Sequence, residues 1–273
     1  MAEESQIGKV RSGIRDVLKG TGEVVSGTTN VVKDVATTAL KDTADVAGSV
    51  AGTASSIVTG ALGAVEEVGT GLVKTVKGVV VGVLQGVGEI ASVTVGVISD
   101  TVRAAFRGTQ EIGEDAAQTA GAIAEGVIST VKGTGVGLAD AATALGRSAL
   151  GGAKEISGDV MAVASSTVSG AASGAAEAGG DVLAAIKGTA KGVIQGAGDI
   201  GADVSDATSA TLSGALEGAK KVGMTLEDAV SAAAQGALEA AEGIGEKAVH
   251  AVRDVAASGV GGVKAVLKGE KET

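Results

Sequence analysis

Few residues in this chain have the type and spacing that catalysis requires. His250 is the only histidine and cysteine is absent, so a catalytic dyad or a metal site would have to be built from carboxylates alone. The serine and threonine hydroxyls lack a neighbouring base, which leaves nucleophilic catalysis without support. We therefore expect a protein that is not an enzyme, without catalytic residues or metal ligands.

One glycine motif matches the pattern of a cofactor site. Gly196-Ala-Gly198-Asp-Ile-Gly201 fits the dinucleotide-binding fingerprint. That fingerprint requires a preceding strand and a βαβ unit, whereas the sequence around this motif is helical in pattern. We expect no cofactor and no small-molecule substrate.

The composition limits the fold and the partners. The 273 residues include 46 glycines, a single aromatic residue (Phe106) and no proline. Compact cores draw much of their buried area from aromatic side chains, so we expect that this chain has no globular core of its own. The strongest helix breaker is missing from the whole length. The net charge of −10 argues against nucleic acid, which needs a basic face.

An apolar repeat of eleven residues runs along the chain. From Val24, steps of 4, 4 and 3 residues reach aliphatic residues, alanine or threonine, with glycine once and never a charge, which settles the period. We call these positions the apolar stripe and expect them to face a lipid or a partner. Its large members include Val24, Val32, Val35, Val46, Val50, Ile57, Val65, Val68, Leu72, Val76, Val79, Val83, Val87, Ile90, Ile98, Ile112, Ile123, Val127, Val131, Leu138, Leu145, Ile156, Val182, Ile186, Ile200, Val222, Leu226, Ile244, Val255 and Val266.

The period predicts an all-α protein. Eleven residues in three turns is about 3.67 residues per turn, close to the α-helical value. We expect a very long amphipathic helix, or helices, over residues 24–266, roughly 360 Å long if unbroken. A polar lead-in (1–23) precedes it and a charged tail (267–273) follows. Because glycine, valine and threonine weaken a helix, we expect folding on binding. Deletion of one eleven, such as Val79 to Glu89, should then be tolerated.

The repeats resemble those of the perilipins and synucleins, which act at lipid surfaces. The resemblance lies in valine-, threonine- and glycine-rich elevens such as GTGEVVSGTTNVV, TGLVKTVKGVVVG and VISTVKGTGVG. It implies a disordered monomer that forms a long helix on membranes or lipid droplets. Those families carry lysine flanks that favour anionic lipid, whereas this chain is acidic. The expected surface is therefore neutral rather than anionic.

Two segments are apolar enough to raise the question of membrane insertion. They are Val46 to Val65 and Gly78 to Ser99, the second with a small-xxx-small series at Gly78, Gly82 and Gly86. Glu89 interrupts the second segment, and the stripe passes through both unchanged, so an interfacial helix is favoured over insertion. The N-terminus mixes acids and bases, so we expect no signal peptide and a cytoplasmic protein peripheral to a membrane or lipid surface.

Two functions remain open from the sequence. The first is an amphipathic helix that coats a lipid surface, such as a membrane, vesicle or lipid droplet. The alternative is a structural protein in which copies of the chain assemble through the same stripe into a right-handed coiled coil, helical bundle or filament. The stripe suits either partner.

Overall fold

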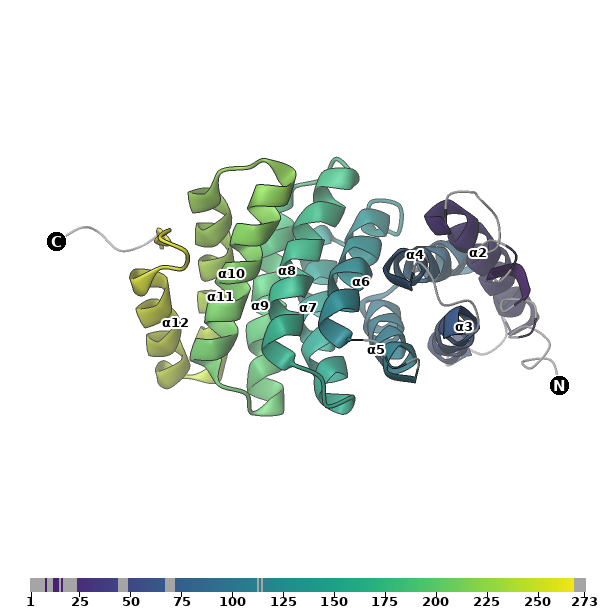
Figure 1. Ribbon diagram of the computed structural model, residues 1–273, viewed down its shortest axis with the longest axis horizontal. Helices are drawn as coiled ribbons and strands as arrows, with labels where there is room; N and C mark the ends of the chain where they lie inside the picture. The colour runs from purple at the N-terminus through teal and green to yellow at the C-terminus, as the bar shows by residue number, and fades with distance from the viewer. Residues whose placement is uncertain are drawn as a thin grey trace.

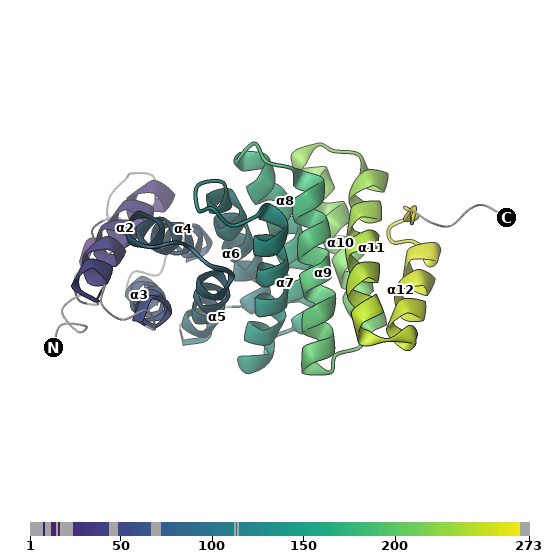
Figure 2. The same ribbon diagram turned by 180° about the vertical axis from the view of Figure 1, so that it is seen from behind.

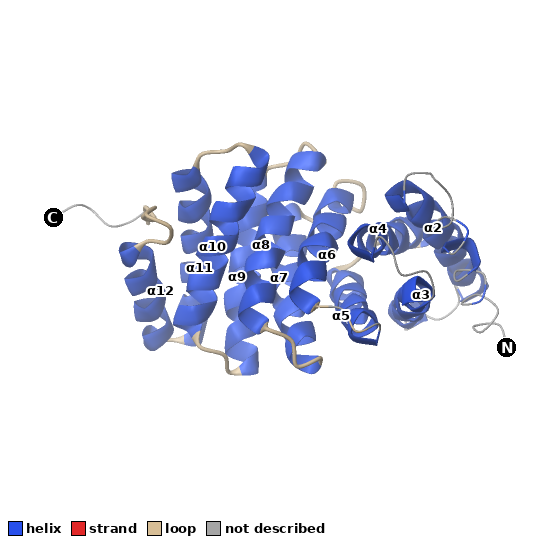
Figure 3. Cartoon of the chain, viewed as in Figure 1, coloured by secondary structure: helices blue, strands red, loops and turns tan. Residues whose placement is uncertain are grey.

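The protein is a stack of α-helices in the computed structural model. The structure describes residues 24–43, 49–66, 72–111, 113 and 115–267, together with 8, 12–14 and 16. Within these residues no strand is present (Figure 3), which confirms the all-α prediction. The helices are α2 (Val24–Thr43), α3 (Ser49–Glu66), α4 (Leu72–Ile90), α5 (Val95–Glu111), α6 (Ala116–Val131), α7 (Leu138–Glu155), α8 (Val160–Glu177), α9 (Val182–Ile200), α10 (Val204–Val222), α11 (Leu226–Ile244) and α12 (Glu246–Ser258).

The helices form two layers. From α2 to α11, each helix makes its most extensive contact with a helix two places away along the chain, either before or after it. The even-numbered helices therefore form one layer and the odd-numbered helices the other, which we call the even layer and the odd layer. The helices follow one another along the long axis of the molecule, with α2 and α12 at opposite ends (Figure 1). The view from behind shows the same order (Figure 2). Short turns make consecutive helices antiparallel, so the helices within a layer run parallel.

Aspartates and glycines set the helix ends. The carboxylates of Asp115, Asp159, Asp181 and Asp203 each accept a backbone N–H in the first turn of the helix that follows. Glycines with positive φ stand in the turns at positions 113, 135, 179, 201, 223 and 245, and the interval between any two of them is a whole number of double elevens. Ser157, with φ of 55°, holds the same place after α7. Aspartate and glycine thus mark the ends of these helices in a chain that has no proline.

The prediction of one very long helix is wrong, and the reason lies in this spacing. A helix of 19 residues, such as α9 or α10, together with its turn fills two elevens. The stripe therefore stays in phase although the chain reverses direction at every turn. A helix and turn that together span two elevens give the same apolar pattern as an unbroken helix, and the helix ends decide between them.

Glycines allow neighbouring helices of one layer to touch through their backbones. A Cβ added to Gly192 of α9 would overlap the carbonyl oxygen of Thr143 in α7. Three further glycines meet a carbonyl at the same separation in the sequence: Gly170 meets Gly121, Gly214 meets Ser165 and Gly236 meets Lys187. Gly78, Gly82 and Gly86 of the small-xxx-small series pack in a similar manner against α2. The glycine content serves close packing between parallel helices.

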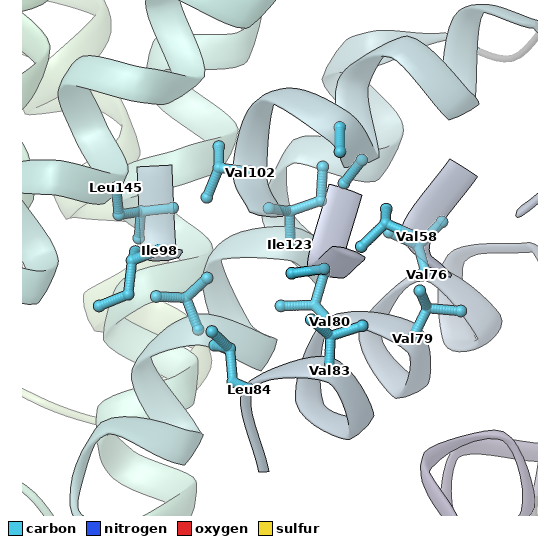
Figure 4. Close-up of a cluster of buried hydrophobic side chains, with 14 of the residues drawn as sticks. Val58, Val76, Val79, Val80, Val83, Leu84, Ile98, Val102, Ile123 and Leu145 are labelled. Carbon is cyan, nitrogen blue, oxygen red and sulfur yellow. The ribbon is translucent and has the colours of Figure 1, made fainter. Parts of the chain in front are cut away.

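The chain has a hydrophobic core, contrary to expectation. Buried aliphatic residues form one cluster that extends from α2 to α9 and a second from α7 to α12. Figure 4 shows part of the first cluster, where Val76 and Val79 of α4 lie close to Val58, and Val80 of the same helix lies close to Ile123. Valine, alanine and leucine fill this interior without aromatic residues other than Phe106. Two elongated clusters of mostly small aliphatic side chains thus take the place of one compact aromatic core.

The lipid-coating function and its self-assembly alternative are both contradicted by this packing. Each requires the stripe to be available to an outside surface, and each assumed a helix that folds on binding. Val76, Val79, Val83 and Val87 are instead fully buried between helices of the same chain. The apolar area is used in the fold, because burial against neighbouring helices stabilises the weak valine- and glycine-rich helices.

The predicted divisions at residues 23 and 266 stay predictions. Between them the structure breaks residues 24–266 into the helices named above. In the part of the chain that is described, no helix has the length and apolarity to cross a membrane.

Candidate interaction groove

A row of three cations crosses the odd layer. Arg103 lies on α5, Arg147 on α7 and Lys191 on α9, evenly spaced at intervals of four elevens. Four elevens, or two helices with their turns, return the chain to the same layer in the same orientation. The three side chains therefore occupy equivalent places on adjacent parallel helices. The row is a consequence of the repeat.

Each cation has an acidic neighbour on the next helix of its layer. Arg147 makes two hydrogen bonds to Asp199 through Nε and Nη2, at 2.5 and 3.1 Å. Arg103 Nη1 lies 3.4 Å from Glu155, which stands at the equivalent place on α7. Lys191 Nζ lies 3.8 Å from Glu239. These pairs are exposed and hold the odd layer together weakly.

A shallow polar groove of about 550 Å³ runs beside this row. Its lining, which defines the interaction groove, comes from α5, α7 and α9 and joins the three cations with Asp140 and Asp199, the hydroxyls of Ser99, Thr143 and Ser148, the amide of Gln195, and Val95 and Ala144. The groove offers hydrogen-bond donors, acceptors and charge. Val95 is 45% exposed and is its main apolar contact surface.

The even layer carries a different ion cluster. Lys77 of α4 lies 2.7 Å from Glu125 of α6 and 2.6 Å from Glu177 of α8. Burial alone would lower the pKa of Lys77, but the hydrogen bonds and charges of the two glutamates together raise it. Near the C-terminal end of α4, the pKa of Glu89 is lowered, mainly by a hydrogen bond from Lys33 and to a smaller extent by one from Thr37.

Side chains also satisfy the carboxyl ends of the helices. Lys132 donates to the backbone carbonyl of Ala178, directly after α8, and Lys154 to that of Ile200, the last residue of α9. Gln110 donates to Ile156 at the end of α7 in the same manner. The donor and the acceptor are separated by the same number of positions in all three bonds. A cation at this place also complements the helix dipole.

The residues of the predicted site do not line the groove. Those in the middle of helices are buried in the core, namely Val32, Val35, Ile57, Val76, Val79, Val83, Val87, Ile98, Ile123, Val127, Leu145 and Ile186, as are Val131 and Ile156 at the ends of α6 and α7. Those that are half-buried lie mostly at helix ends, namely Val24, Val50, Ile90, Leu138, Val182, Ile200, Val222 and Leu226, with Val255 inside α12.

The remaining residues named for the stripe lie at the surface or outside the residues that the structure describes. Ile244 is 44% and Val266 68% exposed. Val46, Val68 and Ile112 lie outside the described residues, as do the side chains of Val65 and Leu72. No part of the stripe forms a continuous exposed surface among the residues that the structure describes.

The other sequence candidates have structural places. Gly196 packs on the Arg147 carbonyl, and Gly201 ends α9 with φ of 69°, so the glycine motif lies at the end of a helix. His250 is exposed on α12. Within the described ranges, no three histidine or acidic side chains gather in a way that could hold a metal ion.

Comparisons with known proteins add no family. No protein family matches the chain, and no curated protein is significantly similar to it. The amino-acid sequence did not predict the interaction groove, because the residues that line it come from three separate helices. The signal that could have found it is the even spacing of Arg103, Arg147 and Lys191.

Proposed function

We propose that this protein is a non-enzymatic helical-repeat scaffold that binds an extended polypeptide segment in the interaction groove. The observation that carries the proposal is the row of Arg103, Arg147 and Lys191 beside a groove that crosses three parallel helices. Stacked helical repeats present extended surfaces of this kind to their partners.

The character of the groove favours a polypeptide over a small molecule. Sites for small molecules are usually enclosed and mostly apolar, whereas this groove is shallow and carries five charged side chains, three hydroxyls and an amide. Helices in contact lie about 8–10 Å apart, so a ligand that reaches all three spans about 20 Å. An extended segment of about six residues has that length.

The absence of enzymatic activity and of nucleic acid binding belongs to the same proposal. The exposed His250 is not among the residues that line the groove. Binding along a phosphate backbone needs an extended basic face, whereas the groove combines its three cations with the carboxylates of Asp140 and Asp199.

A peptide selection tests the proposal. A random peptide library is selected on the full chain, and the selected peptides are measured against Thr143→Trp, which fills the groove at its centre. Gln118→Trp, at an exposed position of α6 in the even layer, is the matched control. We expect Thr143→Trp to weaken binding by about tenfold or more and the control to leave it unchanged. A library without binders, or peptides that bind both variants as well as the wild type, would refute the proposal.

A further inference from the structure

The charged side chains of the interaction groove differ in how strongly they interact with neighbouring groups. Asp199 is held by two hydrogen bonds from Arg147. Asp140 stands in the first turn of α7, where the amino end of the helix offsets a negative charge. Both carboxylates of the groove are therefore already compensated.

The cations at the two ends of the row have weaker partners. Arg103 Nη1 is 3.4 Å from Glu155. Lys191 Nζ is 3.8 Å from Glu239, whose other carboxylate oxygen lies 2.6 Å from Lys187. Exposed pairs of this kind are weak and exchange readily with a competing carboxylate. Arg103 and Lys191 are thus the side chains that can most easily leave their present partners and bind a ligand carboxylate.

Resting on the proposed function, we infer that the groove binds an acidic segment with a carboxylate at about every third residue. Adjacent helices lie about 8–10 Å apart, and a chain in the polyproline II conformation advances about 3.1 Å per residue with three residues per turn, so that every third side chain lies on the same face. Carboxylates at every third position then match the spacing of Arg103, Arg147 and Lys191. The hydroxyls of Ser99 and Thr143 and the amide of Gln195 can bond the peptide groups between them.

The net charge of the whole chain opposes an acidic ligand only at a distance. At 0.1 M salt, charges further than about 10 Å apart are largely screened. A carboxylate in the groove lies in contact with the cation row, so local charge decides the affinity while long-range repulsion slows association.

Fluorescence anisotropy with designed peptides tests the inference. Labelled peptides of equal length carry glutamate at every third position, the same glutamates clustered together, lysine at every third position, or glutamine in place of charge. We expect the spaced glutamate peptide to bind the full chain about tenfold more tightly than the others, since the rest lack either the charge or the spacing.

Charge-removing variants assign the effect to the row. Arg103→Gln and Lys191→Gln should each weaken binding of the spaced glutamate peptide by about threefold to tenfold. Lys33→Gln, in the even layer, should leave it unchanged. Tighter binding of the lysine or clustered peptide, or equal binding by all variants, overturns the acidic ligand while the scaffold proposal stands. If no peptide of any charge binds and the library selection also fails, the proposed function falls with it.

Discussion

The side-chain nitrogen of Lys77 lies 2.6 Å from a carboxylate oxygen of Glu177, although the two residues stand far apart in the sequence. The same nitrogen also binds Glu125 on the helix between them, so one lysine joins three successive helices of the even layer. Glu125 and Glu177 would otherwise bring like charges to adjacent helices. Lys77 has a side chain only 15% exposed, which makes this cluster the most sheltered ion pair described.

Lys77→Met should destabilise the protein by about 1–2 kcal/mol, more than an exposed pair contributes and less than a fully buried one. Thermal unfolding measures the effect, with Lys221→Met as control, because the Lys221–Glu217 pair is more than half exposed. The raised pKa of Lys77 means that its contribution is complete below pH 10.5 and is lost as pH rises through the higher folded value. Equal losses in the two variants would contradict the bridging role.

Gly192→Ala should lower stability by about 1–3 kcal/mol, although alanine is the better helix former, because its Cβ would meet the Thr143 carbonyl. Gly243→Ala is the matched change on α11, where nothing lies within 4 Å of an added Cβ. There the helix propensity should raise stability by about 0.5 kcal/mol. Chemical denaturation measures both variants, and a stabilising Gly192→Ala would contradict the backbone contact.

Ser157→Gly should stabilise the protein by about 1 kcal/mol, because Ser157 adopts a conformation that is strained for a residue with a side chain and free for glycine. Its φ is 55°. The equivalent positions two elevens before and after it, 135 and 179, are already glycine with positive φ. The midpoint of urea unfolding shows the change, and an unchanged or lower midpoint would mean that the strain is absent.

Removal of one complete pair of helices should preserve the fold. Deletion of Asp159 to Ala202 takes out α8 and α9 with their turns and places Asp203 where Asp159 capped a helix. Gly236 then meets the Thr143 carbonyl as Gly192 did. Deletion of Val79 to Glu89, which a continuous helix would tolerate, removes most of α4. We expect cooperative unfolding after the first deletion and its loss after the second, by circular dichroism; the reverse order would contradict the layered fold.

The sequence predicts the helices and part of the buried surface, but not the reversals. Val79 and Ile123 belong to the stripe and are buried, yet Leu84, Leu150 and Ile194 lie outside the stripe and are buried as well. The turns were missed because a unit of two elevens preserves the phase of the stripe. The signals for helix ends lie in residues such as Asp159, Asp203 and Gly201, whereas the absence of proline had suggested a helix without breaks.

The interaction groove was harder to predict because it depends on neighbours far apart in the chain. Arg147 of α7 and Asp199 of α9 meet across two parallel helices, with all of α8 between them in the sequence. A pattern of exposed charges on one helix shows only that the face is solvated. The pairing follows once the two layers are known, since helices two places apart are then adjacent.

The distance between residues 147 and 199 tests the layered fold most directly. Arg147→Cys and Asp199→Cys introduce the only two cysteines at exposed positions, and pulsed electron paramagnetic resonance measures the separation of spin labels attached to them. Parallel neighbouring helices predict a narrow distribution on the order of 15–20 Å, given helix spacings of about 10 Å and the label arms. A distribution near about 78 Å, the separation of these two positions along an unbroken helix, would contradict the account.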